Sequence, residues 1–247
     1  HWGMRDAPDS VYVVAAYLSA YNARAFGVRD YIAQYMFNSP PGTSDAMDLA
    51  KMLAIQTLIS PLRDDNFKIW TQTRTGLLSY PLEPSAARAH LASSVYLQMA
   101  LKPDIVHVVG FTEADHAATA DDVIESCLIA RRSIENALRG APDMTADSKI
   151  KTRKNWLVGE AQIMIQAIID LSENPSIDPL TDPVVLSNAV KIGILDAPQL
   201  RNNKFARGEI QTRIVNGACV SVRANGKTLA EKYRLEDLMR QPKGAKK

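Results

Sequence analysis

The fold is set by residues 28–59, VRDYIAQYMFNSPPGTSDAMDLAKMLAIQTLI, which have the pattern of one strand, one loop and one helix. Residues 28–37 form an apolar and aromatic run of the length of a strand. Two prolines and a glycine in residues 38–44 interrupt this run. Thr43 or Ser44 then stands where an N-cap residue belongs, ahead of an apolar helix. The stretch therefore predicts a strand buried on both faces, which is typical of a parallel sheet.

The same order repeats through the first part of the chain. The other predicted elements are helix 9–26, strand 67–73, helix 85–101, strand 105–109 and a helix that follows Thr119. Strands that alternate with helices indicate right-handed βα units around a parallel sheet. A closed barrel needs eight strands and three are visible, so the sequence predicts an α/β fold in which either the remaining strands of a (β/α)8 barrel of the TIM type lie elsewhere or the sheet is open.

The alternation ends at Gly140. The predicted helix before it has an apolar face, assigned to the core, made of Val123, Ile124, Cys127, Ile134 and Leu138. Beyond it, the sequence predicts a long helix over 145–171, a linker over 175–183, a helix over 184–192 and a small hairpin region with turn signals at Asn216–Gly217 and Asn225–Gly226. We therefore divide the chain into a half barrel, 1–140, and a C-terminal extension, 141–247, which contains helices, a small β-hairpin and a basic tail.

Composition excludes several classes of function. Lys plus Arg is 29 and Asp plus Glu is 27, and a net charge of +2 gives no electrostatic footprint for nucleic acid. No apolar run reaches the roughly 20 residues that a membrane-spanning helix needs. The two cysteines, Cys127 and Cys219, lack metal-like spacing and fit a reducing compartment. We expect a cytoplasmic protein that binds neither nucleic acid nor membrane.

Polar residues follow the predicted strands, where barrel enzymes place their functional groups. Asn38 follows the first strand, Arg74 the second, and Thr112 and Glu113 the third. The guanidinium fork of Arg74 suits a substrate carboxylate, and Arg5 has a comparable place before the first helix. Each residue also has a structural interpretation: turn chemistry for Asn38, an ion pair for Arg74, and a solvated capping acid for Glu113.

A metal centre is a weaker hypothesis. Glu113 and His116 are three residues apart, and His107 lies on the preceding strand. Both loop residues lack the regular geometry that would direct them at one ion. We therefore predict no metal ligands, and keep a metal-dependent barrel enzyme built on Glu113 and His116 as a third hypothesis.

Three segments are similar to the catalytic (epsilon) subunit family of adenosylcobalamin-dependent glutamate mutase, also called methylaspartate mutase. Residues 76–89, GLLSYPLEPSAARA, resemble a family segment of the form GGFPQDESKA. Residues 106–122, VHVVGFTEADHAATADD, resemble a strand, a loop with a Glu-Ala pair and a Thr-rich helix start. Residues 189–219, AVKIGILDAPQLRNNKFARGEIQTRIVNGAC, resemble a helix, a Gly-[IV]-[ILM]-Asp-x-Pro motif, a glycine-containing loop and a Gly-x-Cys end. Together the segments cover most of residues 76–222.

The resemblance implies that this chain forms the second half of a (β/α)8 TIM-type barrel, whose strand ends face a corrinoid held by a separate flavodoxin-like subunit. It implies that Glu113, next to Thr112, holds the ribose of the adenosyl group. It also implies a position near the cofactor for Asn203, Lys204 and Phe205. The family has a lysine four residues before this glutamate, and here that position is Val109.

Two parts of the family are expected on partner chains. The Asp-x-His-x-x-Gly motif that supplies the lower cobalt ligand does not occur here, and the family's early half-barrel, with its catalytic Glu and Tyr residues, has no counterpart. We therefore expect the barrel component of an adenosylcobalamin-dependent radical carbon-skeleton mutase, an isomerase acting on a small acidic substrate. The alternative is a non-catalytic scaffold or interaction subunit of a corrinoid-protein complex, which the valine at position 109 permits.

Overall fold

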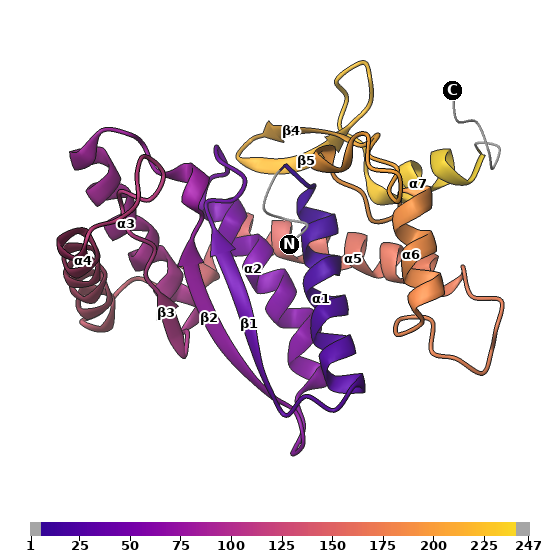
Figure 1. Ribbon diagram of the computed structural model, residues 1–247, viewed down its shortest axis with the longest axis horizontal. Helices are drawn as coiled ribbons and strands as arrows, with labels where there is room; N and C mark the ends of the chain where they lie inside the picture. The colour runs from indigo at the N-terminus through magenta and orange to yellow at the C-terminus, as the bar shows by residue number, and fades with distance from the viewer. Residues whose placement is uncertain (1–5, 241–247) are drawn as a thin grey trace.

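The computed structural model describes residues 6–240, and these form a mixed α/β fold around a small parallel sheet (Figure 1). The sheet has the order β1-β2-β3, with both pairs parallel. Its strands are β1 (Asp30–Phe37), β2 (Lys68–Thr75) and β3 (Ile105–His107). This confirms the predicted α/β class, and residues 6–240 do not close into a barrel.

Four helices alternate with these strands, as the sequence predicts. They are α1 (Asp9–Ala25), α2 (Asp45–Ile59), α3 (Pro84–Gln98) and α4 (Ala120–Leu138). Ser44 caps α2, and Thr119 forms a capping box with Asp122 at the start of α4. The local signals in the sequence therefore place the ends of these helices within a few residues.

The second part of the chain is helical and carries one antiparallel hairpin. Its elements are α5 (Ser148–Ile169), α6 (Pro183–Ile192), β4 (Gln211–Val215), β5 (Ala218–Val222) and α7 (Glu231–Arg240). Helix α6 ends at Gly193 in the left-handed region, with φ 93°, where glycine has no steric penalty. The hairpin turns at Asn216 and Gly217, as the sequence predicts.

One hydrophobic cluster joins the two parts. Helix α2 packs against β1 and against α5, so that it is buried almost all round. The cluster contains Val14, Leu49 and Phe67 from before position 140, and Leu157 and Ala189 from after it. The C-terminal extension is thus part of the same core that covers the back of the sheet.

The predicted core face of α4 is wrong. Val123, Ile124 and Leu138 are exposed, and so is Cys127. The buried residues of α4 are Ser126, Ala130 and Ser133, on the side that packs against α3. Small side chains allow two helices to approach closely, so the contact lies along the small residues. Of the predicted face, Ile134 is partly buried and packs against the neighbouring hydrophobic cluster.

Helices cover only one face of the sheet. Tyr35, Phe37 and Ile69 point into the core on the covered face. On the other face Ile32, Trp70 and Ile105 are 49%, 40% and 37% exposed. Successive side chains of a strand point to opposite faces, so the register places these exposed residues and Arg74 on one open surface. Within residues 6–240, no helix is long and apolar enough to span a membrane.

Candidate functional site

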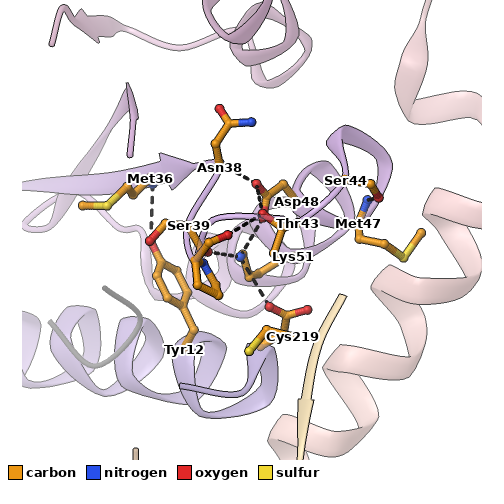
Figure 2. Close-up of polar contacts among 12 residues, drawn as sticks. Tyr12, Met36, Asn38, Ser39, Thr43, Ser44, Met47, Asp48, Lys51 and Cys219 are labelled. Atoms are coloured by element: carbon orange, nitrogen blue, oxygen red, sulfur yellow. Dashed lines mark hydrogen bonds and ion pairs between the residues drawn. The ribbon is translucent and has the colours of Figure 1, made fainter. Parts of the chain in front are cut away.

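A network of four charged side chains, three of them buried, lies at the carboxyl end of β1, and Figure 2 labels two of the four, Lys51 and Asp48. Lys51 Nζ on α2 lies 2.7 Å from Asp48 Oδ1 and 3.4 Å from Asp9 Oδ1 of α1. Arg153 on α5 completes the network through its Nη2, 2.8 Å from Asp9 Oδ2. Two cations therefore balance two carboxylates where α1, α2 and α5 meet.

The electrostatics favour a charged Lys51. Its burial alone would lower the pKa of the ammonium group, but the carboxylates of Asp48 and Asp9 outweigh burial and raise this pKa above its ordinary value. The ring of Tyr12 adds a cation–π contact, with Nζ 5.2 Å from its centroid. Lys51 also donates to the Ser39 carbonyl oxygen at 2.7 Å, which anchors the chain just after β1.

The same network holds the loop in which Asn38 lies. Asp48 Oδ2 accepts hydrogen bonds from the Asn38 backbone N–H and from Thr43 Oγ1, the latter at 2.9 Å. Asn38 has φ 56°, and its side-chain oxygen accepts from Ser94 Oγ at 2.7 Å. Asn38 is therefore a turn residue whose amide oxygen is already engaged, although the sequence names it as a substrate-binding candidate.

Arg74 is in a different electrostatic environment. It lies on β2 opposite His107 of β3, and both side chains belong to the open face of the sheet. Within residues 6–240 Arg74 forms no ion pair, and its Nε is buried without a hydrogen-bond partner. A guanidinium group in this state can take a carboxylate ligand without first breaking an ion pair.

Glu113 is held in place by its own loop. Its Oε1 accepts a hydrogen bond of 2.6 Å from the Gly110 backbone N–H, and the side chain is otherwise exposed. A Cβ atom at Gly110 would come within 3.0 Å of the same oxygen, so glycine gives this carboxylate room to approach the backbone. Thr112, next to it, is 9% exposed, and its hydroxyl is buried without a partner among residues 6–240.

Tyr80 connects the two candidates. Its hydroxyl donates to the Val109 carbonyl oxygen at 3.0 Å. Burial is the largest cause of a rise in the pKa of the Tyr80 phenol to about 12; the charge of Glu113 also raises this pKa, while a hydrogen bond with Thr75 and the charge of Arg74 lower it. Arg74 and Glu113 therefore both lie within electrostatic range of the Tyr80 phenol. The sequence reasoning did not identify Tyr80, which lies in a segment predicted to be a loop.

A second unpredicted pair supports Tyr80. Ser79 Oγ lies 2.8 Å from His90 Nε2, and the His90 ring meets Tyr80 edge-on, 5.2 Å between centroids. Burial lowers the pKa of His90, while the nearby carboxylate of Asp45 opposes this shift. Because Ser79 Oγ also donates to the Gly76 carbonyl oxygen, the pair closes the turn after β2.

The structure does not bring residues 203–205 to Glu113. Lys204 lies over the ring of Phe205, 4.7 Å from its centroid, and Phe205 N donates to Asn203 Oδ1. This loop leads from α6 to β4, on the opposite side of β1 from α3 and α4 (Figure 1). Arg5 lies outside the described residues.

The base of the same loop is built around one carboxylate. Asp196 is buried and accepts three backbone hydrogen bonds, from Gly208 at 2.7 Å, Glu209 at 2.9 Å and Ile210 at 3.0 Å. This explains the aspartate of the GILDAP segment as a structural residue that orders the loop.

The C-terminal hairpin does reach the end of β1. The Ser44 backbone N–H donates to the Gly217 carbonyl oxygen at 2.8 Å, and Thr212 Oγ1 donates to the Asp6 carbonyl oxygen at 2.7 Å. The turn of the hairpin therefore covers the loop of residues 38–44. This is a long-range contact for which the sequence offers no local signal.

Residues 6–240 contain no group of three or more His, Cys, Asp or Glu side chains placed to hold a metal ion. His116 Nδ1 lies 3.0 Å from Asp115 Oδ2, and its Nε2 lies 3.9 Å from Asp122 Oδ2. Both contacts tie His116 to the start of α4, and neither involves Glu113.

No protein-family model matches the chain, and the search of curated proteins finds no match either. The functional argument therefore rests on the geometry of the open face of the sheet and of the loops at its carboxyl edge.

Proposed function

We propose that this chain is the barrel component of an adenosylcobalamin-dependent radical carbon-skeleton mutase that acts in the cytoplasm. The observation that carries the proposal is the geometry at the carboxyl edge of a parallel sheet, where Arg74 Nε is buried without a partner among residues 6–240 and Glu113 uses one oxygen in its own loop. Active sites of (β/α) barrels lie at this edge.

The open sheet face supports a half barrel. Three parallel strands carry helices on one face only, and Ile32, Trp70 and Ile105 are exposed on the other. In a closed barrel such a face becomes the packed interior. The proposal therefore requires a partner chain that carries the first half of the barrel, in addition to a flavodoxin-like subunit that binds the corrinoid.

Arg74 is proposed to bind the substrate. A buried guanidinium nitrogen without a partner costs roughly 1–3 kcal/mol, and a substrate carboxylate would remove this cost by accepting two parallel hydrogen bonds. His107 lies beside Arg74 in the register of the sheet and can donate a further hydrogen bond. The substrate class proposed is therefore a small carboxylic acid.

Glu113 fits the recognition of a ribose. Its Oε1 bonds to Gly110, and no contact within residues 6–240 engages its Oε2, which can accept a hydrogen bond from a ribose hydroxyl. Val109 is buried next to Tyr80 and Phe111, so no cationic side chain assists from that position. Adenosylcobalamin, when bound, supplies the radical by its own chemistry. The chain's own part is to orient the ligand through Glu113, hold the acid through Arg74 and exclude water.

The proposal is tested on the complex that this chain forms with the products of the neighbouring genes. The complex is expected to bind adenosylcobalamin, followed by absorbance, and to give a paramagnetic signal that depends on an acidic substrate. A stoichiometric complex without affinity for a corrinoid contradicts the proposal.

Two substitutions at one position separate a role in ligand binding from a structural one. Glu113→Gln keeps an oxygen for the Gly110 hydrogen bond but loses the charge, so it is expected to slow turnover while the loop stays folded. Glu113→Ala removes the loop hydrogen bond as well. Turnover of Glu113→Gln at the rate of the wild type removes Glu113 from the site.

A specific observation favours the alternative of a non-catalytic scaffold subunit. One oxygen of Glu113 already serves its own loop, and the position of the family's lysine is a buried valine. The neighbouring genes discriminate between the two: a neighbour with an Asp-x-His-x-x-Gly motif and another with the early half-barrel favour the enzyme, and the absence of both favours the scaffold.

A further inference from the structure

A cavity of about 600 Å³ lies along the free edge of β1. Strand β1 is the last strand of the sheet on this side and pairs only with β2. Helices α1 and α6 form the other walls of the cavity. Its lining includes Ala15 and Ala16 of α1, Ile32 and Gln34 of β1, and Leu186 and Val190 of α6.

The backbone of β1 presents unpaired hydrogen-bonding groups to this cavity. In a parallel ladder the N–H and C=O groups of one residue point to the same side of the strand. The Arg29 carbonyl oxygen accepts from Lys68 N–H of β2, and the Phe37 carbonyl oxygen accepts from Gly76 N–H, so the backbone groups of the odd-numbered residues of β1 point toward β2. The backbone groups of Ile32 and Gln34 therefore point to the free edge. The backbone of Met36 does so too, and its N–H donates to Tyr12 Oη at 3.3 Å.

The order of the elements indicates what kind of segment fits the cavity beside β1. Helix α1 leads directly into β1 and packs against it (Figure 1). In a right-handed βα arrangement the helix before a strand also covers the neighbouring parallel strand. The small side chains of Ala15 and Ala16 leave that space open, and the cavity occupies it. The cavity therefore lies where a further strand beside β1 would pack under α1.

The residues that line the cavity restrict the charge of the segment that can bind there. None of the described residues that line the cavity is charged, and most are apolar. An occupant with a buried charge would find no counter-ion, whereas an uncharged strand would satisfy the backbone groups of Ile32 and Gln34. We infer that the free edge of β1 binds, in parallel, an extended uncharged segment of a partner chain whose alternate side chains fill the cavity under α1.

This inference rests on the proposed function for the identity of the partner, which is the complementary half-barrel chain, but the addition of a strand is tested without a corrinoid. The probe is a panel of acetylated and amidated peptides of eight residues, the length of β1, that alternate valine with threonine or serine. Amide exchange of each β1 residue is followed by NMR. At a peptide concentration ten times Kd, the Ile32 and Gln34 amides are expected to exchange about tenfold more slowly, while Ala33 and Tyr35 stay unchanged.

Matched controls test whether the peptide pairs with the β1 backbone and fills the cavity. Peptides methylated on the backbone nitrogens that face β1 should lose binding, and peptides methylated on the opposite set should keep it. Ala16→Trp fills the cavity and should weaken binding at least tenfold, whereas Ala89→Trp, on the exposed side of α3, should not. Both variants are first checked for cooperative unfolding.

Four outcomes overturn the inference. These are the absence of binding across the panel, equal protection of odd and even amides, wild-type affinity in Ala16→Trp, and a homodimer of this chain in which the same edge is protected. Because none of these measurements involves a corrinoid, a failure here is distinct from a failure of the proposed mutase function.

Discussion

The ends of β1 and β2 lie side by side in the sheet, yet the charged side chains at the two ends differ in whether they have ion-pair partners. At the end of β1, Lys51 has two carboxylate neighbours and a backbone carbonyl, all in the interior. At the end of β2, Arg74 has no ion pair within residues 6–240 and faces the open side of the sheet. The charged side chains of the first region lie in ion pairs, and the guanidinium group of the second does not.

The difference shows which charges shape the fold and which can meet a ligand. A buried ion pair that is fully matched fixes the elements that supply it, and here it ties α1, α2 and α5 to the loop after β1. An unmatched cation contributes little to that architecture and retains its capacity to bind an anion. We therefore expect substitutions at the two strand ends to separate effects on stability from effects on binding.

The largest effect is expected for Lys51→Met. Removing one partner of a buried ion pair leaves uncompensated carboxylates and costs about 3–5 kcal/mol of the free energy of unfolding. Urea denaturation measures this, with the exposed Lys149→Met as a control that should stay within about 0.5 kcal/mol. A loss below about 1 kcal/mol would contradict the structural role of the network.

The pH dependence has a definite sign. The pKa of Lys51 is raised in the folded chain, so its contribution to stability is fully present below its ordinary pKa of about 10.4 and is lost as the pH rises through the folded value. The wild type should therefore lose more stability than Lys51→Met above this pH.

The next effect concerns the hairpin that covers the β1 loop. Gly217 and Gly226 have φ 80° and 79°, so alanine costs about 1–2 kcal/mol at either position. At Gly217 a methyl group would also overlap Ser44 Oγ, whereas at Gly226 its nearest neighbour is the flexible Arg213 side chain at 3.2 Å. Gly217→Ala should therefore be less stable than Gly226→Ala by about 1 kcal/mol or more, and equal stability would show that the hairpin does not dock there.

A smaller effect on stability is expected from the protonation of His90, whose ring contacts Ser79 and Tyr80 in the turn after β2. Burial lowers its pKa below the ordinary value of about 6.5, so the unfolded chain takes up a proton first as the pH falls. The free energy of unfolding should therefore decrease below about pH 6.5, by less than about 1.4 kcal/mol per pH unit. His90→Gln should remove this slope, and an unchanged slope between pH 5 and 7 would assign it elsewhere.

The smallest loss of stability is expected for Arg74→Gln. Because Arg74 has no ion pair to lose within residues 6–240 and its unpartnered Nε costs roughly 1–3 kcal/mol, the free energy of unfolding should stay unchanged or rise. The same change at Arg234, whose guanidinium meets Glu231 and two carbonyl oxygens in the interior, should cost about 3–5 kcal/mol. Calorimetry with a small dicarboxylate should show at least a tenfold loss of affinity for Arg74→Gln, and undiminished affinity would exclude Arg74 as its ligand.

Much of the fold follows from local patterns. The apolar run of residues 28–37, the break at two prolines and the cap at Ser44 each have a short-range cause, and β1 and α2 form as these signals predict. Capping of α4 by Thr119 is equally local. The buried face of α4 could not be predicted in this way, because the helix packs chiefly through Ser126, Ala130 and Ser133 while most of its large apolar side chains stay exposed.

The candidate site was only partly predictable. Arg74 and Glu113 were named because they follow strands, and that position depends only on the order of elements. The sequence also carries a signal for Lys51, because a lysine and an aspartate three residues apart within an apolar helix indicate a buried pair. Tyr80 had no such signal, because its partners Val109 and Glu113 come from a loop about thirty residues away.

The sequence by itself determined the alternation of strands and helices, their ends and the polar residues that follow each strand, since hydrophobic period, capping and turn chemistry act over a few residues. Only the tertiary structure decided which charges are paired. That Lys51 pairs with Asp9, and that Arg74 has no ion pair within residues 6–240, depends on how α1, α5 and the open sheet face pack, over separations along the chain that no local pattern encodes.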